Sequence, residues 1–248
     1  SYSRWWEART LWGGIINSAR VLARLIITFT DSHGHQPNYN QQRSHTFKTE
    51  MVYLTIAWAH ALRLHLRQQN QWQQLLPFLN SEEYTAMLAA NNKPNYLQLL
   101  AGKKIYEAMA NGTLAGFDSF QMEGQLLSLA NYQGGCERIK TTPLFRQYSL
   151  FSRIFVHLFI VLLPFALLTE MSKFSDYGIW LVIPFSVLIS WVFMTMEQSG
   201  ESSENPFDNG TSDTPMSTIC RNIEIDILEM LDEPNIPPKM EPFNNNLL

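Results

Sequence analysis

The sequence predicts an all-α protein that combines a membrane helical hairpin with a bundle of amphipathic helices. Two observations carry this prediction. Apolar residues recur at helical spacing along most of the 248-residue chain, and two adjacent segments of about twenty residues are almost purely apolar. Charged residues make up only 16% of the chain, below the roughly 25% typical of soluble proteins, which agrees with membrane-embedded segments. No run of alternating polar and apolar residues supports a strand.

The two apolar segments cover about residues 150–169 and 178–195. At 1.5 Å per residue, each is long enough to cross the roughly 30 Å hydrocarbon core of a bilayer. Pro164 and Pro184 would break helices in water, but membrane spans tolerate proline. Because the connection between the segments is short, we expect an antiparallel hairpin in the lipid bilayer. The alternative is a buried hairpin of a soluble protein.

Basic residues flank this hairpin unequally. Arg138, Lys140 and Arg146 precede the first span, whereas the connecting loop carries only Lys173. The positive-inside rule therefore predicts that both ends of this chain lie in the cytosol, with the short loop on the far side of a plasma or inner membrane. His157, within the first span, is interpreted as a packing histidine rather than a proton site.

Amphipathic helices are predicted in the rest of the chain. The spacing of apolar residues favours a first helix over about residues 4–29 and a second over about 44–69. Ser81, followed by acidic residues in the next turn, is predicted to be the N-cap of a short third helix.

Proline and glycine mark the later helices. Pro94 is suited to begin a fourth helix, and Gly112 is suited to end it. Asp118 and Gln121 resemble a capping box, which predicts a fifth helix from there to about residue 138. A last helix is expected to open after Pro215, with apolar residues at every fourth position.

We divide the chain into a helical region over residues 1–147, a two-span hairpin over 148–197 and an acidic segment over 198–248. The net charge of −4 hides an asymmetry, since residues 198–248 carry 10 acidic and 2 basic side chains. This segment also keeps an apolar helical pattern, so we expect it to dock onto the basic first half of the chain. The acidic balance, without any basic run, excludes a nucleic-acid-binding protein.

Catalytic and metal-binding patterns are weak. Cys136 has no local histidine to act as a base, and Cys220 lies in an apolar helix, so both are interpreted as buried structural thiols. An intramembrane enzyme using His157 or Cys136 would need a second polar catalytic group in the spans, where only Arg153 is available. We therefore predict neither catalysis nor a cofactor.

Two clusters of polar residues suggest metal ligands only faintly. His33 and His35 form a pair without a third ligand, and a polar turn is the simpler interpretation. Carboxylate and amide oxygens cluster just after the second span but lack the spacing of an EF-hand, so an acidic connector is favoured over a calcium site. These oxygens belong to Glu201, Glu204, Asn205 and Asp208.

Three blocks of residues carry a family resemblance. They are Tyr2-x-Arg4-Trp5-Trp6-Glu7-Ala8-Arg9; Gly135-Cys136-Glu137-Arg138, followed by Pro143 and by Pro164 inside the first span; and Glu204-Asn205-Pro206-Phe207. In this order and context they resemble the bestrophin family, specifically its bacterial-type branch, over nearly the whole chain.

The resemblance implies one subunit of a homopentameric ion channel. Chloride or another monovalent anion is the family's usual ion; a monovalent cation channel of the bacterial type and a non-conducting membrane-anchored scaffold are the alternatives. In the family, the first span and the hydrophobic neck of the pore lie upstream of the first block. We therefore expect this chain to be a fragment or an incomplete gene model that does not conduct alone.

The resemblance also assigns roles to residues outside the membrane. By position, Phe117 corresponds to the second, cytosolic constriction of the pore, although it could equally be a core aromatic. Glu7, Arg9, Glu137 and Arg138 are predicted to form structural ion pairs between helices and subunits. The acidic run that holds calcium in animal relatives is too dilute here, so we predict no metal site.

Overall fold

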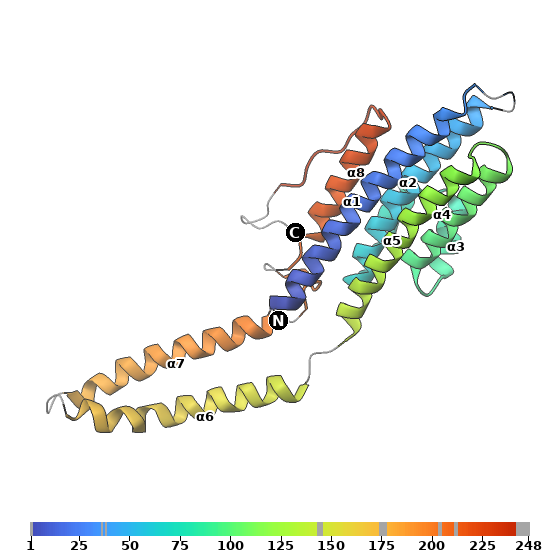
Figure 1. Cartoon of the computed structure of the whole chain (residues 1–248). Coiled ribbons are helices and arrows are strands. Elements are labelled where there is room, and N and C mark those ends of the chain that lie inside the picture. Colours follow the sequence, from blue (N-terminus) through green and yellow to red (C-terminus); the bar gives the residue numbers. More distant parts are fainter. Residues whose placement is uncertain are drawn as a thin grey trace. The chain divides into compact units, whose positions relative to one another are not determined.

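The computed structural model describes residues 2–35, 37, 39–142, 146–173, 178–202, 205–210 and 213–241. Within these ranges every regular element is a helix, as predicted (Figure 1). In chain order they are α1 (Tyr2–Ser32), α2 (Gln41–Leu66), the 3-10 helix η1 (Trp72–Phe78), α3 (Ser81–Ala89), α4 (Lys93–Ala110), α5 (Gly116–Thr141), α6 (Arg146–Met171), α7 (Gly178–Ser202) and α8 (Met216–Met230).

The chain forms two compact units. One unit contains residues 141–205 together with the first five residues of the chain, and it includes α6 and α7. The other contains residues 6–140 and 206–248, and it holds the remaining helices. Helix α1 begins in the first unit and continues into the second.

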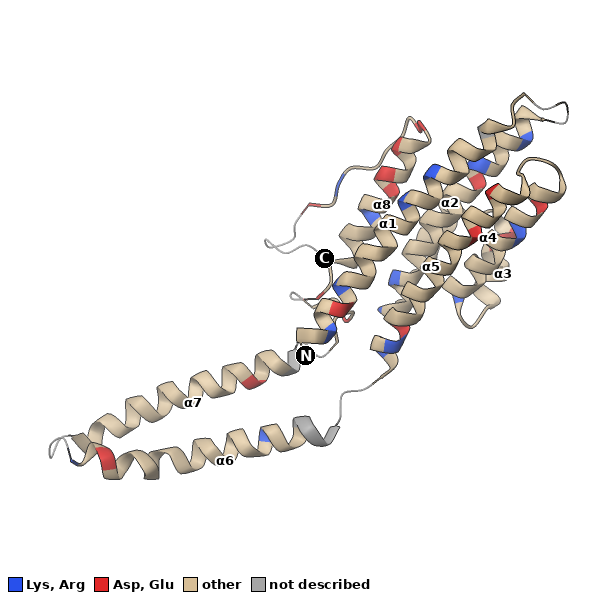
Figure 2. Cartoon of the chain, in the orientation of Figure 1, with Lys and Arg blue, Asp and Glu red and all other residues tan. Residues whose placement is uncertain are grey.

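Helices α6 and α7 form the predicted hairpin and pack against each other, with the rings of Phe159 and Phe193 4.8 Å apart. Their most apolar stretches, Leu150–Met171 and Gly178–Gly200, are long and apolar enough to cross a membrane. Only 6% and 11% of these stretches is buried, whereas a core helix of a soluble protein is mostly buried. Lys, Arg, Asp and Glu are sparse along both helices (Figure 2). The hairpin therefore presents apolar side chains outward, as lipid-facing helices do.

Two polar side chains of α6, Arg153 and His157, have partners within the hairpin. Arg153 Nε lies 3.5 Å from Glu197 Oε1 of α7, an ion pair that we did not predict. His157 Nδ1 lies 2.7 Å from the carbonyl oxygen of Arg153, one turn earlier in α6. This hydrogen bond gives His157 a partner within α6, while its side chain is exposed, so its interpretation as a packing histidine stays a prediction.

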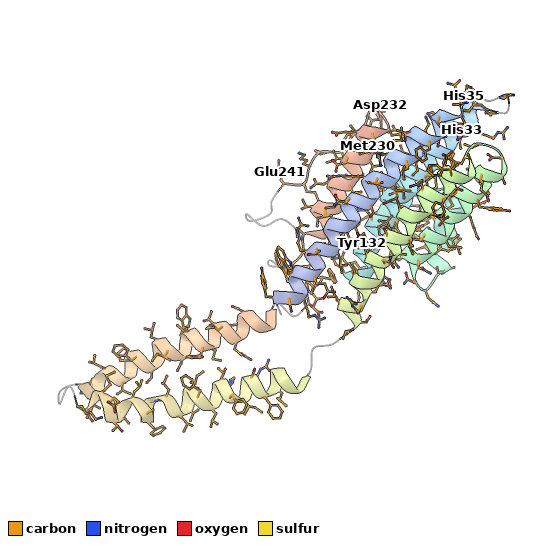
Figure 3. All side chains as sticks on the ribbon, in the orientation of Figure 1. His33, His35, Tyr132, Met230, Asp232 and Glu241 are labelled. Atoms are coloured by element: carbon orange, nitrogen blue, oxygen red, sulfur yellow. The ribbon has the colours of Figure 1, made fainter. Side chains whose placement is uncertain are left out.

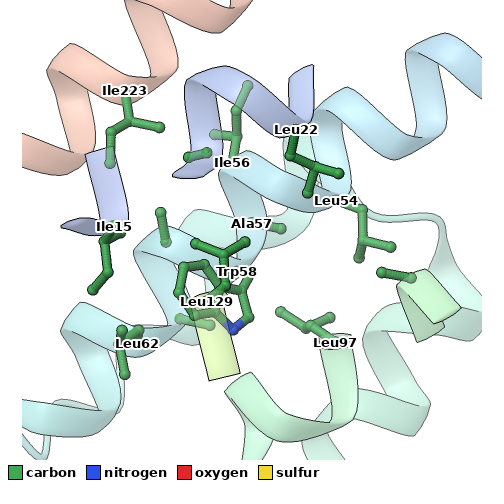
Figure 4. Packing of buried hydrophobic residues seen from close by; sticks show 14 of the residues in the cluster. Ile15, Leu22, Leu54, Ile56, Ala57, Trp58, Leu62, Leu97, Leu129 and Ile223 are labelled. Atoms are coloured by element: carbon green, nitrogen blue, oxygen red, sulfur yellow. The ribbon is translucent and has the colours of Figure 1, made fainter. Parts of the chain in front are cut away.

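Helix α2 forms the centre of the second unit, where it packs against η1, α4 and α8. Between Met51 and Leu66 its side chains are buried almost all the way round, which is the pattern of a core helix. Figure 4 shows α2 residues such as Trp58 and Leu62 among apolar side chains of the neighbouring helices. These neighbours include Ile15 of α1, Leu97 of α4, Leu129 of α5 and Ile223 of α8.

Local capping chemistry explains where α3 and α4 begin and end. Asn80, not Ser81 as predicted, is the N-cap of α3: its side chain accepts the Glu83 N–H at 2.8 Å, and the Glu83 carboxylate accepts the Asn80 N–H at 3.1 Å. Pro94 lies in the first turn of α4, and Gly112 follows this helix with a φ of +79°, both as predicted.

Helix α5 begins two residues before the predicted start, and we did not predict η1. Asp118 is therefore the third residue of α5, where its carboxylate accepts the Ala115 N–H at 2.9 Å. This bond supplies the reciprocal half of a capping box, while Gln121 has no part in the cap. The 3-10 helix η1 contains Pro77, which interrupts the apolar spacing by which α-helices are recognised.

Helices α1 and α5 meet through two glycine notches. A Cβ atom on Gly14 of α1 would lie 2.6 Å from Cε1 of Tyr132, and a Cβ on Gly135 of α5 would lie 2.9 Å from Cδ1 of Leu11. Each helix thus offers a glycine to a large side chain of the other. This explains physically why Gly135 of the second sequence block has no side chain.

Gly14→Ala is expected to lower the free energy of unfolding by about 1 kcal/mol, because overpacking against Tyr132 costs about 1–3 kcal/mol and the gain in helix propensity offsets part of it. Gly13→Ala is the matched control: its Cβ meets only Arg9 Nη1 at 3.9 Å. It should raise stability by about 0.5–1 kcal/mol. Urea denaturation followed by circular dichroism measures both, and equal effects would show that the Gly14 notch is unimportant.

The acidic C-terminal segment docks on the basic first half, as predicted. Ile219, Ile223 and Ile227 of α8 are buried against the bundle. Arg20 Nη2 of α1 lies 2.5 Å from Asp226 Oδ2 of α8. This ion pair joins the two oppositely charged parts of the chain, and acidic side chains are frequent on α8 (Figure 2).

Helices α2 and α8 also share a buried polar cluster. His60 Nε2 lies 3.2 Å from Glu224 Oε2, and the Arg63 and Arg67 guanidinium groups donate to Ser217 Oγ at 3.3 and 2.6 Å. Burial lowers the pKa of His60 below its ordinary value of 6.5, and this outweighs the hydrogen bond to Glu224, which raises it. His60 is therefore neutral at pH 7.

Candidate functional site

Helix α5 exposes an uncharged face that we call the α5 stripe. Its members recur every three or four residues, so they share one side of the helix. They are Phe117, Phe120, Gly124, Leu127, Asn131 and Gly134, all exposed. The side chains of Phe117, Phe120 and Leu127 are 67%, 74% and 63% exposed. Large apolar side chains aligned on an exposed surface mark a face that contacts another molecule or a second copy of the same chain.

Phe117 lies at the N-terminal end of the α5 stripe, in the first turn of the helix. Its ring centroid is 6.5 Å from that of Phe29 near the end of α1, and most of its surface remains exposed. Phe117 is therefore not a core aromatic of the single chain. This finding removes one of the two sequence-based interpretations of the residue.

Asp118 lies about 100° around the helix from Phe117, where it is buried and anchors this turn. Its carboxylate is buried, and Oδ2 lies 2.5 Å from Nε2 of His33, at the end of α1. The same oxygen accepts the Ala115 N–H. Figure 3 places His33 and His35 at one end of the chain's first helix pair. The histidines thus form a polar turn, as interpreted, but the pairing of His33 with Asp118 was missed.

A polar cluster on the side of α5 opposite the α5 stripe determines which side of the helix faces the bundle. The side-chain oxygen Oε1 of Gln133 accepts hydrogen bonds from Trp58 Nε1–H and Gln98 Nε2–H, each at 3.2 Å. The Gln133 amide donates to Glu137 Oε1 at 2.8 Å, and Asn92 donates to the same carboxylate at 2.9 Å. Because these bonds tie the inner side of α5 to α2 and α4, the opposite side must face outward.

The predicted ion pairs are only partly present within one chain. Arg138 Nη2 lies 2.5 Å from Glu7 Oε1, which joins α5 to α1. Glu137 serves the polar cluster instead, and its Oε1 lies 3.7 Å from Nε2 of His65. Arg9 is exposed and makes no ion pair with the described residues of the same chain. Glu7 and Arg138 thus form an ion pair between helices, and the pairing of Arg9 between subunits stays a prediction.

The first sequence block opens α1. Trp5 is half-buried and its ring stacks on Tyr2, with centroids 6.1 Å apart. Arg4 is also half-buried, whereas Trp6 is 58% exposed. The two adjacent tryptophans therefore occupy different environments, because neighbouring residues lie about 100° apart around a helix.

The other motif residues have structural surroundings. Phe207 is fully buried, and the carbonyl oxygen of Pro206 accepts the Thr214 N–H at 3.0 Å. These two residues therefore stabilise the segment that precedes α8. Asn205 is exposed, and Pro164 is half-buried inside α6. Pro143 and Glu204 lie outside the described residues.

The two thiols are not reactive. Burial is the main cause that raises the pKa of both Cys136 and Cys220 to about 12. The Cys220 Sγ lies 3.3 Å from the carbonyl oxygen of Ala59. Both cysteines are therefore buried structural residues, as predicted.

Among the described residues, no group of three or more His, Cys, Asp or Glu side chains is placed to hold a metal ion. Of the oxygens considered for calcium, Asp208 Oδ1 lies 2.6 Å from Nζ of Lys140. The side chain of Glu201 and all of Glu204 lie outside the described residues. Asp208 is therefore the ion-pair partner of Lys140.

Comparison with known proteins gives the family. The family model described as Bacterial/Fungal Bestrophin protein matches residues 1–229. The voltage-dependent anion channel-forming protein YneE of Escherichia coli (strain K12) is 34% identical over 242 residues, which are 97% of this chain and 73% of that protein. The voltage-dependent anion channel-forming protein RSc3414 of Ralstonia nicotianae is 30% identical over 236 residues, or 95% of this chain and 72% of that protein.

The fold agrees with these matches. The crystal structure of a bacterial bestrophin homolog from Klebsiella pneumoniae superposes with a TM-score of 0.82 at 31% identity, covering 94% of this chain and 80% of that one. The resemblance stated from the three sequence blocks is thereby confirmed, and the chain is a membrane protein of a channel family rather than an enzyme. This protein belongs to the Bacterial/Fungal Bestrophin family.

Proposed function

We propose that this protein is a subunit of an anion channel in which five copies surround one pore, with chloride as the principal ion. The observation that carries the proposal is the 34% identity, over 97% of the chain, to a protein named as forming a voltage-dependent anion channel. The apolar α6–α7 hairpin supports it, because such a hairpin can embed each subunit in the bilayer.

The α5 stripe lines the pore outside the membrane, and Phe117 forms its constriction. Five Phe117 rings around one axis would make an apolar ring that gates conduction by excluding water. The stripe itself contains no carboxylate, and the carboxylate of Asp118 is buried beside His33. Glu123 is exposed on the adjacent part of α5, so the choice of an anion rests on the named relative and not on the charge of this wall.

The bundle and both ends of this chain lie in the cytosol, and the α6–α7 connection lies on the other side of the membrane. The basic residues Arg138, Lys140 and Arg146 before α6 support this orientation. Cysteine labelling with a membrane-impermeant reagent tests it: a cysteine replacing Lys173 should react from outside intact cells, and a cysteine replacing Lys239 should not.

Phe117→Ala is expected to raise single-channel conductance at least about twofold. Five methyl groups leave a wider constriction than five phenyl rings, and water fills it more readily. Tyr106→Ala is the matched control, since Tyr106 on α4 is 66% exposed and lies outside the α5 stripe. Planar bilayer recording measures both. Equal conductance in the Phe117 variant, the Tyr106 variant and the wild type would remove Phe117 from the constriction.

Assembly is tested on the protein expressed from its complete gene, so that any coding sequence upstream of Ser1 is included. Native mass spectrometry in detergent should show five copies, and proteoliposomes should release chloride. A monomer that releases no chloride would contradict the proposal and favour a membrane-anchored scaffold.

A further inference from the structure

A cavity of about 820 Å³ lies in the helical bundle, away from the α5 stripe. Its walls come from α2, η1, α8 and the segment that follows α8. That segment turns at Asp232 and runs back along α8 (Figures 1 and 3). The volume lies within the range of about 300–1,000 Å³ that small-molecule sites occupy. Nothing in the proposed channel function uses this cavity.

One wall of the cavity is aromatic. The rings of His60 and Phe78 stack with centroids 5.8 Å apart and an interplanar angle of 8°. The Tyr53 ring lies 6.2 Å from the Phe78 ring between centroids, with an interplanar angle of 58°. Faces and edges of several rings thus gather in one cavity, and the faces of aromatic rings attract cations.

The cavity also carries net negative charge. Its charged side chains are the carboxylates of Glu224 and Glu233 and the guanidinium of Arg221, while His60 is neutral at pH 7. Arg221 Nη1 lies 2.9 Å from Glu224 Oε2, so these two charges neutralise each other. The negative charge of Glu233 is not neutralised within the described residues, because its carboxylate accepts a hydrogen bond only from the neutral Tyr53 hydroxyl, at 3.1 Å.

The position of Glu233 also favours a positively charged ligand. It follows the C-terminus of α8, where the helix dipole also favours cations. An anionic ligand is disfavoured because Arg221, the single guanidinium in the lining, is already paired. A metal ion is disfavoured because the described residues bring no three metal-ligating groups together.

We propose that this cavity binds a small organic ammonium cation that carries apolar substituents. Glu233 neutralises the ammonium group, Tyr53 and Phe78 contact it through their rings, and Pro77, Leu228 and Ile236 surround the substituents. A quaternary ammonium compound combines these properties, because its charge is spread over methyl groups that aromatic and apolar walls can contact.

Isothermal titration calorimetry on the whole protein in lipid nanodiscs tests the proposal, with empty nanodiscs as the blank. The probes are choline and benzyltrimethylammonium, and the neutral isostere of choline, 3,3-dimethylbutan-1-ol. Both cations should bind, with benzyltrimethylammonium tighter because its ring fills the apolar part of the cavity. The neutral isostere should bind roughly threefold to thirtyfold more weakly than choline, the range that cation–π contacts contribute.

Variants then identify the cavity as the site. Glu233→Gln should weaken choline binding roughly tenfold, because it removes the unpaired charge with little change of shape. Glu107→Gln is the control, since Glu107 is an exposed carboxylate on α4 outside the cavity. Tyr53→Phe should retain most of the affinity because it keeps the ring. Circular dichroism checks that each variant is folded.

Three results would overturn the proposal: no heat from either cation at millimolar concentration, equal binding of choline and its neutral isostere, or equal affinity in the Glu233 and Glu107 variants. Because calorimetry does not depend on conduction, a failure here leaves the channel proposal untouched. A failure of the channel proposal likewise leaves the cavity untouched.

Discussion

Trp12→Ala is expected to lower the free energy of unfolding by about 3–5 kcal/mol, the range observed when large aromatic side chains are removed from protein cores. Trp12 of α1 is fully buried in the main apolar cluster. Its removal leaves a cavity that neighbouring helices can fill only partly, because their side chains already pack in the cluster. Trp12 is thus expected to be among the most sensitive positions of the bundle.

Trp6→Ala provides the matched comparison in the same helix. Trp6 is 58% exposed, so its removal should change the free energy of unfolding by about 0.5 kcal/mol or less. Urea denaturation followed by far-ultraviolet circular dichroism measures both variants. Similar losses for the two tryptophans would show that the bundle does not depend on the buried face of α1.

Acidification is expected to destabilise the protein through His60. The buried imidazole has a pKa below 6.5, whereas in the unfolded chain it returns to 6.5, so the unfolded state binds more protons below that pH. The stabilisation is therefore fully present above pH 6.5 and falls as the pH drops toward the folded pKa. The slope is about 1.4 kcal/mol per pH unit at most, which gives a loss of up to about 2 kcal/mol between pH 7 and 5.

The groups facing His60 determine the sign of this effect. Glu224 favours the protonated ring, while Arg63 and Arg221 oppose it and burial opposes it most. The His60→Gln variant cannot titrate at this position but retains an amide that can donate to Glu224. Stability measured from pH 5 to 7.5 should therefore fall less steeply for the variant than for the wild type. Parallel curves would show that His60 does not carry the pH dependence.

The sequence predicts the parts of the fold that depend on local composition. The two spans are recognisable because a membrane span needs about twenty consecutive apolar residues, whatever surrounds them. The docking of α8 is predictable because its isoleucines recur on one face and its charge is opposite to that of the first half. Glycine and proline mark the ends of α4 because their backbone preferences act locally.

Features that depend on residues distant in the sequence could not be predicted. His33 and Asp118 are 85 residues apart, and the bonds of Gln133 reach α2 and α4. Polar side chains of this kind do not differ, in the sequence, from the many exposed amides of this chain. The cavity could not be predicted from the sequence for the same reason, since its walls come from α2, η1, α8 and the segment after α8.

Phe117 shows the limit of periodicity. An apolar residue at helical spacing usually marks the buried side of a helix, and Phe117 and Phe120 satisfy that pattern. The buried side of α5 is instead the one that carries Met122, Leu126 and Leu129, with Gln133 held by the polar cluster. The helix therefore has apolar residues on two faces, and only packing decides which one is exposed.

The most direct test of an anion channel is the reversal potential of the protein, expressed from its complete gene, in planar bilayers under a gradient of KCl. We predict a reversal potential close to the chloride equilibrium potential, and substitution of potassium by a larger cation should leave it unchanged. A reversal potential close to the potassium equilibrium potential would contradict anion conduction and establish a cation channel. A verified pentamer that carries no current would contradict conduction itself.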